Sequence, residues 1–363
     1  MENYHKLILI KNNRPHAFLC NFTLENLVSL LKKFGLLLFL FLLLSCQKQE
    51  KPSISFYYWK TIFKFPESEK AILKNNQVQK LYVRYFDIDL LEKTNEAFPK
   101  APIQFQEKTT GFKVVPVIYI KNKVFLNPKI NFEELAAKTN SFINQINAKN
   151  NISINEVQFD CDWTLTSKDR FFKFIKAFKK VAKVKISATI RLHQIKYYQK
   201  TGVPNVDKAV LMYYNMGKIA PDSLNSIYDK KIADKYLESL QKYPLQLEIA
   251  LPIYSWAIHI RDGKITGLKS KISIENIKKD TNFVQVNETF FKAKNPCFKS
   301  GTYYKTNDIL KFESISEEDL LEMTDDLKEN LKQNPNEIIF YDLDEFNTQQ
   351  YENEIFTKIS NRF

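Results

Sequence analysis

Glycine and cysteine are scarce in this 363-residue chain, which contains 7 glycines and 4 cysteines. The sequence has no glycine-rich phosphate loop, no serine nucleophile elbow and no paired-histidine metal motif. Its few cysteines form neither a disulfide framework nor a metal-binding cluster. We therefore expect no metal ion and no other cofactor.

Acidic residues are outnumbered by basic ones, 41 against 54, which gives a formal net charge of +13. The lysines and arginines are scattered along the chain and do not form a block of the kind that binds nucleic acid. Nucleic acid is therefore not an expected partner. With 44% hydrophobic residues, the chain is long enough for one large core or two medium ones.

A long membrane-spanning run is also missing near the amino terminus. The apolar run 36–44 is much shorter than the roughly 20 residues that a transmembrane helix needs. It follows the basic pair Lys32 and Lys33 and ends just before Cys46. A basic region, a short apolar region and a cysteine resemble a bacterial lipoprotein signal, in which Cys46 is the lipidated residue.

This pattern predicts three segments: a signal peptide over residues 1–45, a linker over 46–53 and a folded domain over 54–363. It also predicts a protein held in the bacterial cell envelope, at the outer membrane or cell surface, by a lipid on Cys46. Cys161 and Cys297 would then be the remaining thiols. Cys161 is expected to be a small buried hydrophobe, and a disulfide between the two stays possible.

Eight β-type runs of 7 to 10 residues follow the linker. They cover residues 54–60, 80–88, 113–120, 156–163, 184–192, 208–216, 245–254 and 337–344. Helical periodicity appears between several of them, most clearly in 132–150 and in 167–183, where Ser167 is a candidate N-cap. Alternating strands and helices favour parallel βαβ units, and eight of them predict an α/β fold, a closed (β/α)8 TIM barrel.

The longest connection lies between the seventh and eighth strands. Residues 255–336 contain further aromatic runs and an acidic helical segment. We expect a small α+β insertion there.

The segment VQFDCDWT at 157–164 has two faces. Side chains alternate along a strand, so Asp160 and Asp162 share one face with Gln158, opposite an apolar face that includes Cys161. In a TIM barrel, chemistry lies at the carboxyl ends of the strands. The two aspartates are therefore candidate site residues.

Other strand ends are equally polar or aromatic. The candidate catalytic residues are Asp160, Asp162 and Asp342. The candidate substrate-binding residues are Asp87, Trp163, Arg191, Tyr214, Asn215, Tyr254, Trp256 and Asp344. Tryptophan and tyrosine beside carboxylates combine apolar contact with hydrogen bonding, which suits sugar rings.

Two arginines on strands need partners inside a barrel. Asp160 and Glu248 are the natural ones for Arg84 and Arg191. Such pairs would serve either a structural ion-pair network or a substrate clamp. His193 has no second histidine or cysteine nearby, and we interpret it as a hydrogen-bonding loop residue.

Four segments resemble the family 18 glycoside hydrolases, the chitinase-like barrels. VQFDCDW is similar to their fourth-strand motif, LMYYNMG to the sixth-strand segment and IALPIYSWA to the seventh-strand segment; IIFYDLDE is similar to the last strand. The resemblance implies a (β/α)8 barrel that acts on or binds a polysaccharide.

The chain departs from that family at its most important position. Thr164 stands where the family has the glutamate that protonates the glycosidic oxygen, and Asn215 stands where it has aspartate. A threonine hydroxyl cannot serve as a general acid near neutral pH. Either Asp162 or a carboxylate from another strand end (Asp87, Asp89, Asp342, Asp344 or Glu345) would have to replace it.

Three hypotheses follow. The protein is a glycoside hydrolase with a relocated acid, a barrel that binds glycan or protein without catalysis, or a structural lipoprotein whose insertion docks a partner. The sequence leaves enzymatic activity open.

Overall fold

The computed structural model describes Lys32 and residues 51–363. The predicted signal peptide 1–45, the lipidation site Cys46 and most of the linker 46–53 lie outside the described residues. Within the described part, none of the helices is long and apolar enough to cross a bilayer.

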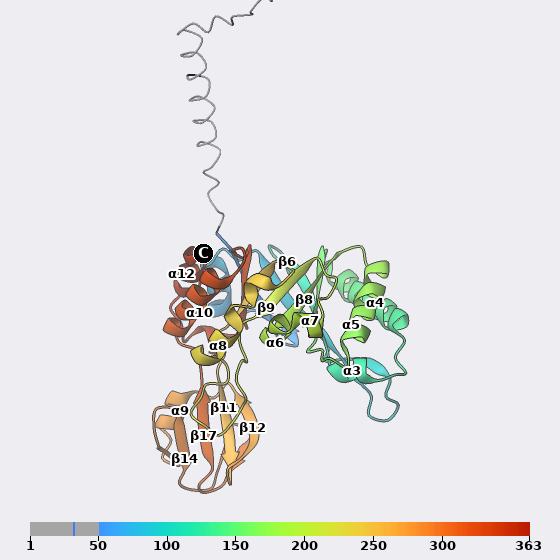
Figure 1. The fold of residues 1–363 in the computed structure, drawn as a ribbon. Coiled ribbons are helices and arrows are strands. Elements are labelled where there is room, and N and C mark those ends of the chain that lie inside the picture. Colours follow the sequence, from blue (N-terminus) through green and yellow to red (C-terminus); the bar gives the residue numbers. More distant parts are fainter. Residues whose placement is uncertain (1–31, 33–50) are drawn as a thin grey trace, which may run out of the picture. The chain divides into compact units, whose positions relative to one another are not determined.

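Eight parallel strands close into a barrel, as predicted (Figure 1). They are β1 (Ser53–Tyr58), β3 (Lys80–Leu90), β6 (Lys113–Ile120), β7 (Glu156–Asp160), β8 (Lys185–Arg191), β9 (Lys208–Met212), β10 (Leu247–Pro252) and β18 (Glu337–Tyr341). Each strand pairs with the next, and β1 pairs with both β18 and β3. This double pairing completes the ring.

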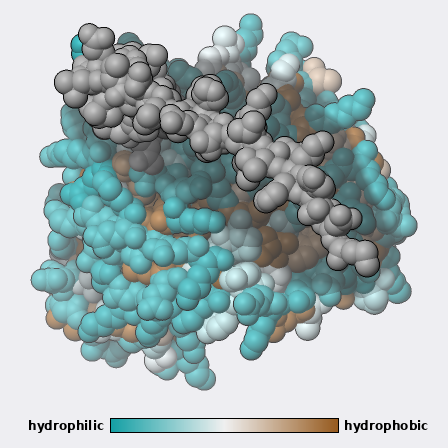
Figure 2. All heavy atoms as spheres, turned by 45° about the horizontal axis from the view of Figure 1, so that its top comes forward, coloured by the Kyte–Doolittle hydropathy of each residue, from teal (hydrophilic) through white to brown (hydrophobic). Residues whose placement is uncertain are grey.

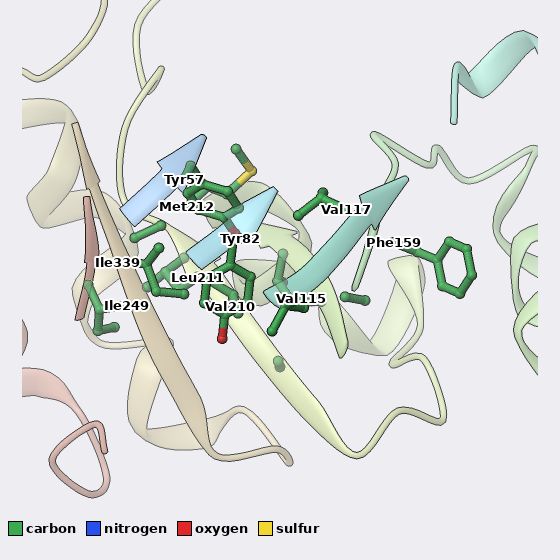
Figure 3. Packing of buried hydrophobic residues seen from close by; sticks show 14 of the residues in the cluster. Tyr57, Tyr82, Val115, Val117, Phe159, Val210, Leu211, Met212, Ile249 and Ile339 are labelled. Atoms are coloured by element: carbon green, nitrogen blue, oxygen red, sulfur yellow. The ribbon is translucent and has the colours of Figure 1, made fainter. Parts of the chain in front are cut away.

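The two faces of each strand have different surroundings. Tyr57 and Tyr82 point into the barrel, where their ring centroids lie 5.3 Å apart, whereas Phe159 points outward onto α5 (Figure 3). Cys161 is buried, as predicted, and both Cys161 and Cys297 are free thiols, so no disulfide joins them. The predicted alternation of 157–161 is confirmed.

The amino-terminal end of the barrel interior is polar. Lys208 Nζ lies 2.9 Å from Glu156 and 3.3 Å from Glu337, and Lys80 lies 2.8 Å from Glu337. The attraction between these lysines and glutamates compensates for the hydration that the charges lose inside the barrel. This layer is part of the core and lies at the opposite end from the candidate site.

Helices occupy most connections between the barrel strands. They are α2 (Glu67–Asn75), α3 (Asn122–Leu126), α4 (Phe132–Asn150), α5 (Lys168–Val181), α6 (Leu192–Lys196), α7 (Tyr198–Thr201), α8 (Lys230–Leu237), a 3-10 turn (Leu240–Lys242), α10 (Glu317–Asn330), α11 (Glu345–Thr348) and α12 (Ile355–Arg362). Between β3 and β6 the chain instead forms the short strands β4 (Ala97–Lys100) and β5 (Gln104–Phe105); β5 pairs with β2 (Ile62–Phe63). The strict alternation of strand and helix is thus broken at this connection.

The two predicted helices are present, and their ends show how the sequence sets them. Asn131 caps α4 by accepting a hydrogen bond from the Glu134 N–H at 3.0 Å. Ser167 stands at the N-cap of α5 but makes no capping bond. Its hydroxyl instead donates to Asn122 Oδ1 and accepts from the Thr164 N–H, so the predicted cap is wrong in its bonding.

The insertion is a second sheet with its own core. Its strands are β11 (Trp256–Arg261), β12 (Lys264–Ser270), β13 (Phe283–Gln285), β14 (Phe290–Ala293) and β17 (Ile309–Glu313), with α9 (Ile274–Lys278) and the hairpin β15 (Cys297–Lys299) and β16 (Thr302–Tyr304). The acidic helix α10 packs against α12 and α8 of the barrel. The inserted sheet spans 256–313 and lies within the predicted insertion 255–336.

Hydrophilic side chains predominate on the face seen in Figure 2. This agrees with the lysine-rich outer faces of helices such as α5, whose apolar face is buried.

Candidate functional site

Polar side chains from several strands meet at the carboxyl end of the barrel. Along β6, β7 and β8 the inward positions pair across strands, with Tyr119 beside Asp160. Arg191 ends β8, two residues beyond the inward Thr189. The strand ends thus bring together residues that are far apart in the sequence, as the barrel hypothesis required.

Asp160 is buried at this end, with 5% of its surface exposed. Its Oδ1 accepts a hydrogen bond of 2.6 Å from the Thr189 hydroxyl. Burial raises the pKa of the Asp160 carboxyl to about 6, although the nearby charge of Arg191 opposes the shift. Keeping the Asp160 carboxyl ionised in this buried position therefore lowers the free energy of unfolding.

Two arginine–aspartate pairs line the rim. Arg191 donates to Asp162 through Nε at 2.5 Å and Nη2 at 3.2 Å, and the Asp162 side chain is 48% exposed. Arg84 binds Asp87 in the same bidentate manner, at 2.7 and 2.6 Å. Both aspartates accept two hydrogen bonds from a permanent cation, which fixes the orientation of their carboxylate oxygens.

These partners differ from the expected ones. Neither arginine forms an ion pair with Asp160 or Glu248. Glu248 accepts instead from the Glu337 N–H at 2.8 Å and from Asn336, at the amino-terminal end of the barrel. The predicted pairing was wrong because the alternation of side chains along a strand tells which face a residue occupies but not its height along the barrel axis.

A bulge in β3 makes the Arg84–Asp87 pair possible. The strand register shifts between Arg84 and Phe86, so that Arg84 lies opposite Val117 and Asp87 opposite Tyr119. Val117 and Tyr119 both face inward, and the two β3 side chains therefore share one face despite their odd separation.

Tyr341, at the end of β18, is the centre of an aromatic cluster. Its ring stacks on Tyr214 at 5.6 Å and meets Tyr57, Trp59 and Tyr254 edge-on at 5.4 to 5.7 Å. Sequence reasoning missed Tyr341 and Trp59. Both lie within predicted strands, Trp59 next to the end of 54–60 and Tyr341 inside 337–344, and the observed end of β18 at Tyr341 is what places that ring at the rim.

The predicted aromatic residues differ in accessibility. Tyr214 and Tyr254 are largely buried, and the Tyr254 hydroxyl donates to the exposed Asn215 at 2.5 Å. Trp256 is half-buried and donates through Nε1 to Glu313 at 2.8 Å. The Tyr214 hydroxyl is buried and has no hydrogen-bond partner among the described residues. It is an available donor next to Tyr341.

Trp163 does not lie in this cluster. Only 1% of it is exposed, its ring stacks on Phe171 at 5.0 Å, and its Nε1 donates to the Thr201 carbonyl at 3.0 Å. No face remains for a sugar ring, so we omit Trp163 from the candidate site. The neighbouring Thr164 is exposed, and its hydroxyl lies 2.9 Å from that of Thr166.

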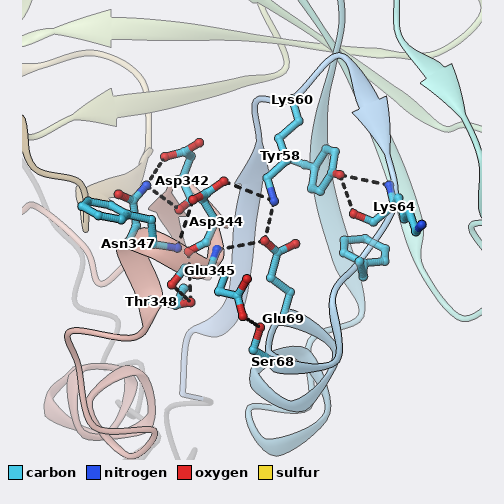
Figure 4. A network of polar contacts seen from close by, with 12 residues as sticks. Tyr58, Lys60, Lys64, Ser68, Glu69, Asp342, Asp344, Glu345, Asn347 and Thr348 are labelled. Atoms are coloured by element: carbon cyan, nitrogen blue, oxygen red, sulfur yellow. Dashed lines mark hydrogen bonds and ion pairs between the residues drawn. The ribbon is translucent and has the colours of Figure 1, made fainter. Parts of the chain in front are cut away.

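Asp342 and Asp344 form a second acidic group just after β18 (Figure 4). Asp344 is ion-paired with Lys271 at 2.7 Å and with Lys60 at 3.2 Å. Although burial opposes its charge, these lysines hold the pKa of Asp344 below its ordinary value. Lys60 also bonds to Glu69, a buried carboxylate of α2.

Asp342 differs from the ion-paired acids at the rim in its partner, and from the buried Asp160 in its greater exposure. It is half-buried, and its Oδ1 accepts a hydrogen bond of 2.7 Å from the Asn347 side chain, not from a cation. Burial, reinforced by the charge of Asp344, raises the pKa of Asp342 to about 6. An accessible carboxyl of this kind can carry a proton near neutral pH.

Burial raises the pKa of the Tyr341 hydroxyl, and the charges of Asp342 and Asp160 add to the effect. Among residues 51–363 there is no cluster of three histidine, cysteine, aspartate or glutamate side chains that could hold a metal ion.

Fold and site together define a class: a (β/α)8 barrel with an acidic and aromatic carboxyl-terminal rim and an inserted sheet. The chain matches no protein-family model, and the search of curated proteins found no match.

Solved structures do show a likeness to this chain. The spore cortex-lytic enzyme SleL of Bacillus cereus has a TM-score of 0.49 at 14% identity, over 86% of this chain and 75% of that chain. A GH18 chitinase from Cycas revoluta in complex with (GlcNAc)3 has a TM-score of 0.48 at 13% identity, over 85% and 98%. A tamarind chitinase-like lectin has a TM-score of 0.42 at 10% identity, over 86% and 99%.

At these identities the likeness concerns the fold alone. The closed barrel is established independently by the pairing of the strands in this chain.

Proposed function

We propose that the protein hydrolyses a glycosidic bond of a polysaccharide at the carboxyl-terminal rim, with Asp342 as the proton donor. The observation that supports this is the state of Asp342. It is a half-buried carboxyl with a pKa raised to about 6 and a neutral hydrogen-bond partner. Glycoside hydrolysis needs such an acid to protonate the leaving oxygen, and raising a carboxyl pKa toward the working pH is how enzymes provide it.

The other residues have complementary roles in this proposal. Asp160 in its ionised form would stabilise the positive charge that develops on the sugar ring in the transition state, so activity should be greatest near pH 6, where Asp342 is partly protonated and Asp160 is partly ionised. Asp162 and Asp87, held by Arg191 and Arg84, offer oriented oxygens to sugar hydroxyls. The half-buried Trp256 provides apolar contact for a sugar face.

We further propose that the protein works from the bacterial cell envelope, anchored by a lipid on Cys46. Support comes from the sequence pattern of a basic pair, a short apolar run and a cysteine.

Asp342→Asn tests the catalytic proposal. The variant should lose about 100-fold or more in the release of reducing ends from a glycan panel, because an amide cannot donate the proton. In the wild type, activity should fall as pH rises above about 6, since the acid works only when protonated. Asp234→Asn is the matched control, because this aspartate lies on the exposed surface of α8. Unchanged activity in Asp342→Asn would remove Asp342 from the mechanism.

The second candidate function is glycan binding without cleavage. Thr164 at the position of the usual acid favours it, as do the two aspartates locked to arginines. Saccharide binding by the wild type with no turnover at any pH from 4 to 8 would select this alternative.

A further inference from the structure

The hairpin of β15 and β16 in the inserted sheet presents an exposed aromatic pair. Phe298 is 80% exposed and Tyr303 is 43% exposed, and their ring centroids lie 4.9 Å apart. They are direct partners across the two strands. Exposed aromatic side chains that cluster in this way usually mark a contact surface.

The hairpin holds this pair in place. Tyr304, the next residue, turns the other way into the core of the insertion, where its ring packs on Phe283 at 5.4 Å. Arg261 donates to the Tyr303 carbonyl at 3.0 Å, and Lys299 is ion-paired with Asp280 at 2.5 Å. Because the backbone is tied at several points, the two rings form a preorganised platform.

This platform is separate from the rim of the barrel. Trp256 begins β11 at the barrel, and Ile260 pairs with Ile309 at the other end of the sheet, where the hairpin segment joins β17. Five residues of strand span about 17 Å. The aromatic pair is therefore a different surface from the candidate site.

The size of the pair argues against a protein partner. A stable protein interface covers about 800 Å² on each side, whereas two aromatic side chains contribute about 300 to 500 Å² even when fully covered. An area of this size matches a few sugar rings, whose apolar faces pack on aromatic planes.

The charge around the pair points to an anionic ligand. Residues 256–313 contain eleven basic and six acidic residues, and the exposed Lys294 and Lys305 flank the hairpin in the sequence. The positive charge of the inserted segment therefore favours a polymer that bears acid groups.

We propose that the β15–β16 hairpin is a second polysaccharide-binding site, which takes an acidic polysaccharide by stacking sugar rings on Phe298 and Tyr303. The inference rests on the proposed function for the ligand class, a polysaccharide, but it needs no catalysis at the rim. Its effect would be to hold the substrate chain near the barrel.

The test measures retardation of the full chain, purified in detergent, in gels that contain polygalacturonate, chondroitin sulfate or a neutral β-glucan. The wild type should be retarded by at least one acidic polymer. The double variant Phe298→Ala/Tyr303→Ala should bind that polymer at least about 10-fold more weakly than the wild type. High salt should weaken wild-type binding, because the lysines contribute through charge. The neutral glucan should retard the protein much less.

Tyr197→Ala is the matched control, since Tyr197 is 50% exposed on the barrel. An unchanged melting temperature of the double variant verifies its fold. The proposal is overturned if the wild type binds neither acidic polymer, if the double variant binds like the wild type, or if Tyr197→Ala has the same effect. Asp342→Asn should bind the acidic polymers as the wild type does. If the wild type binds through the hairpin but releases no reducing ends from any glycan of the panel, the catalytic proposal is refuted and this one stands.

Discussion

At the scale of single residues, Asp160 has a consequence for stability. Its pKa rises from 3.8 to about 6 on folding, because burial disfavours the charge. The folded state then binds more protons than the unfolded state between about pH 4 and 6, so unfolding becomes easier as pH rises through that window. A shift of this size corresponds to about 3 kcal/mol at neutral pH.

Asp160→Asn should therefore stabilise the protein at pH 7 and leave it nearly unchanged at pH 4. Asparagine retains an oxygen that can accept the bond from Thr189 and carries no charge. Denaturant unfolding at both pH values measures the difference. Equal effects at pH 4 and 7 would mean that the charge of Asp160 carries no such cost.

At the scale of elements, β17 contains a buried ion pair whose two side chains also bond to other segments of the chain. Lys311, only 1% exposed, lies 2.6 Å from Glu313 and donates to the Leu224 carbonyl at 2.6 Å and to the Ala220 carbonyl at 3.2 Å. Glu313 in turn accepts from Ser226 and Trp256. The loop after β9 and the half-buried Trp256 are thus both attached to this strand.

Lys311→Met should destabilise the protein by about 3 to 5 kcal/mol, because it leaves Glu313 buried and unpaired. Replacing both residues, in Lys311→Met/Glu313→Gln, should restore part of that loss, since the uncompensated charge is then gone. Chemical denaturation of the wild type and both variants gives the comparison. A double variant no more stable than the single one would show that lost packing, and not the unpaired charge, dominates.

At the scale of the whole molecule, the envelope proposal makes a prediction about Cys46. Cys46→Ser should abolish lipid attachment and processing, because the modified atom is the cysteine sulfur. The readouts are the mass of the mature amino terminus and incorporation of labelled fatty acid. Cys161→Ser is the control, since that thiol is buried in the barrel. Label retained in Cys46→Ser would contradict the lipoprotein interpretation.

The number of strands and the closed barrel could be predicted from the sequence. Eight β-type runs with helical segments between them predicted the closed barrel, and the alternation around Phe159 and Asp160 gave the correct inward and outward faces. Periodicity is visible in residues that are neighbours in the sequence, so strands and helices can be predicted without knowledge of the tertiary structure.

The tertiary structure alone decided which charges pair and which aromatics remain accessible. The bulge in β3 puts Arg84 and Asp87 on one face, and the height of each residue along the barrel separates Glu248 from Arg191. Burial, which depends on what packs above a residue, removed Trp163 from the site and distinguished the half-buried Asp342 from the ion-paired Asp162. Pairing and burial depend on contacts between distant segments, and the order of residues along one strand does not contain them.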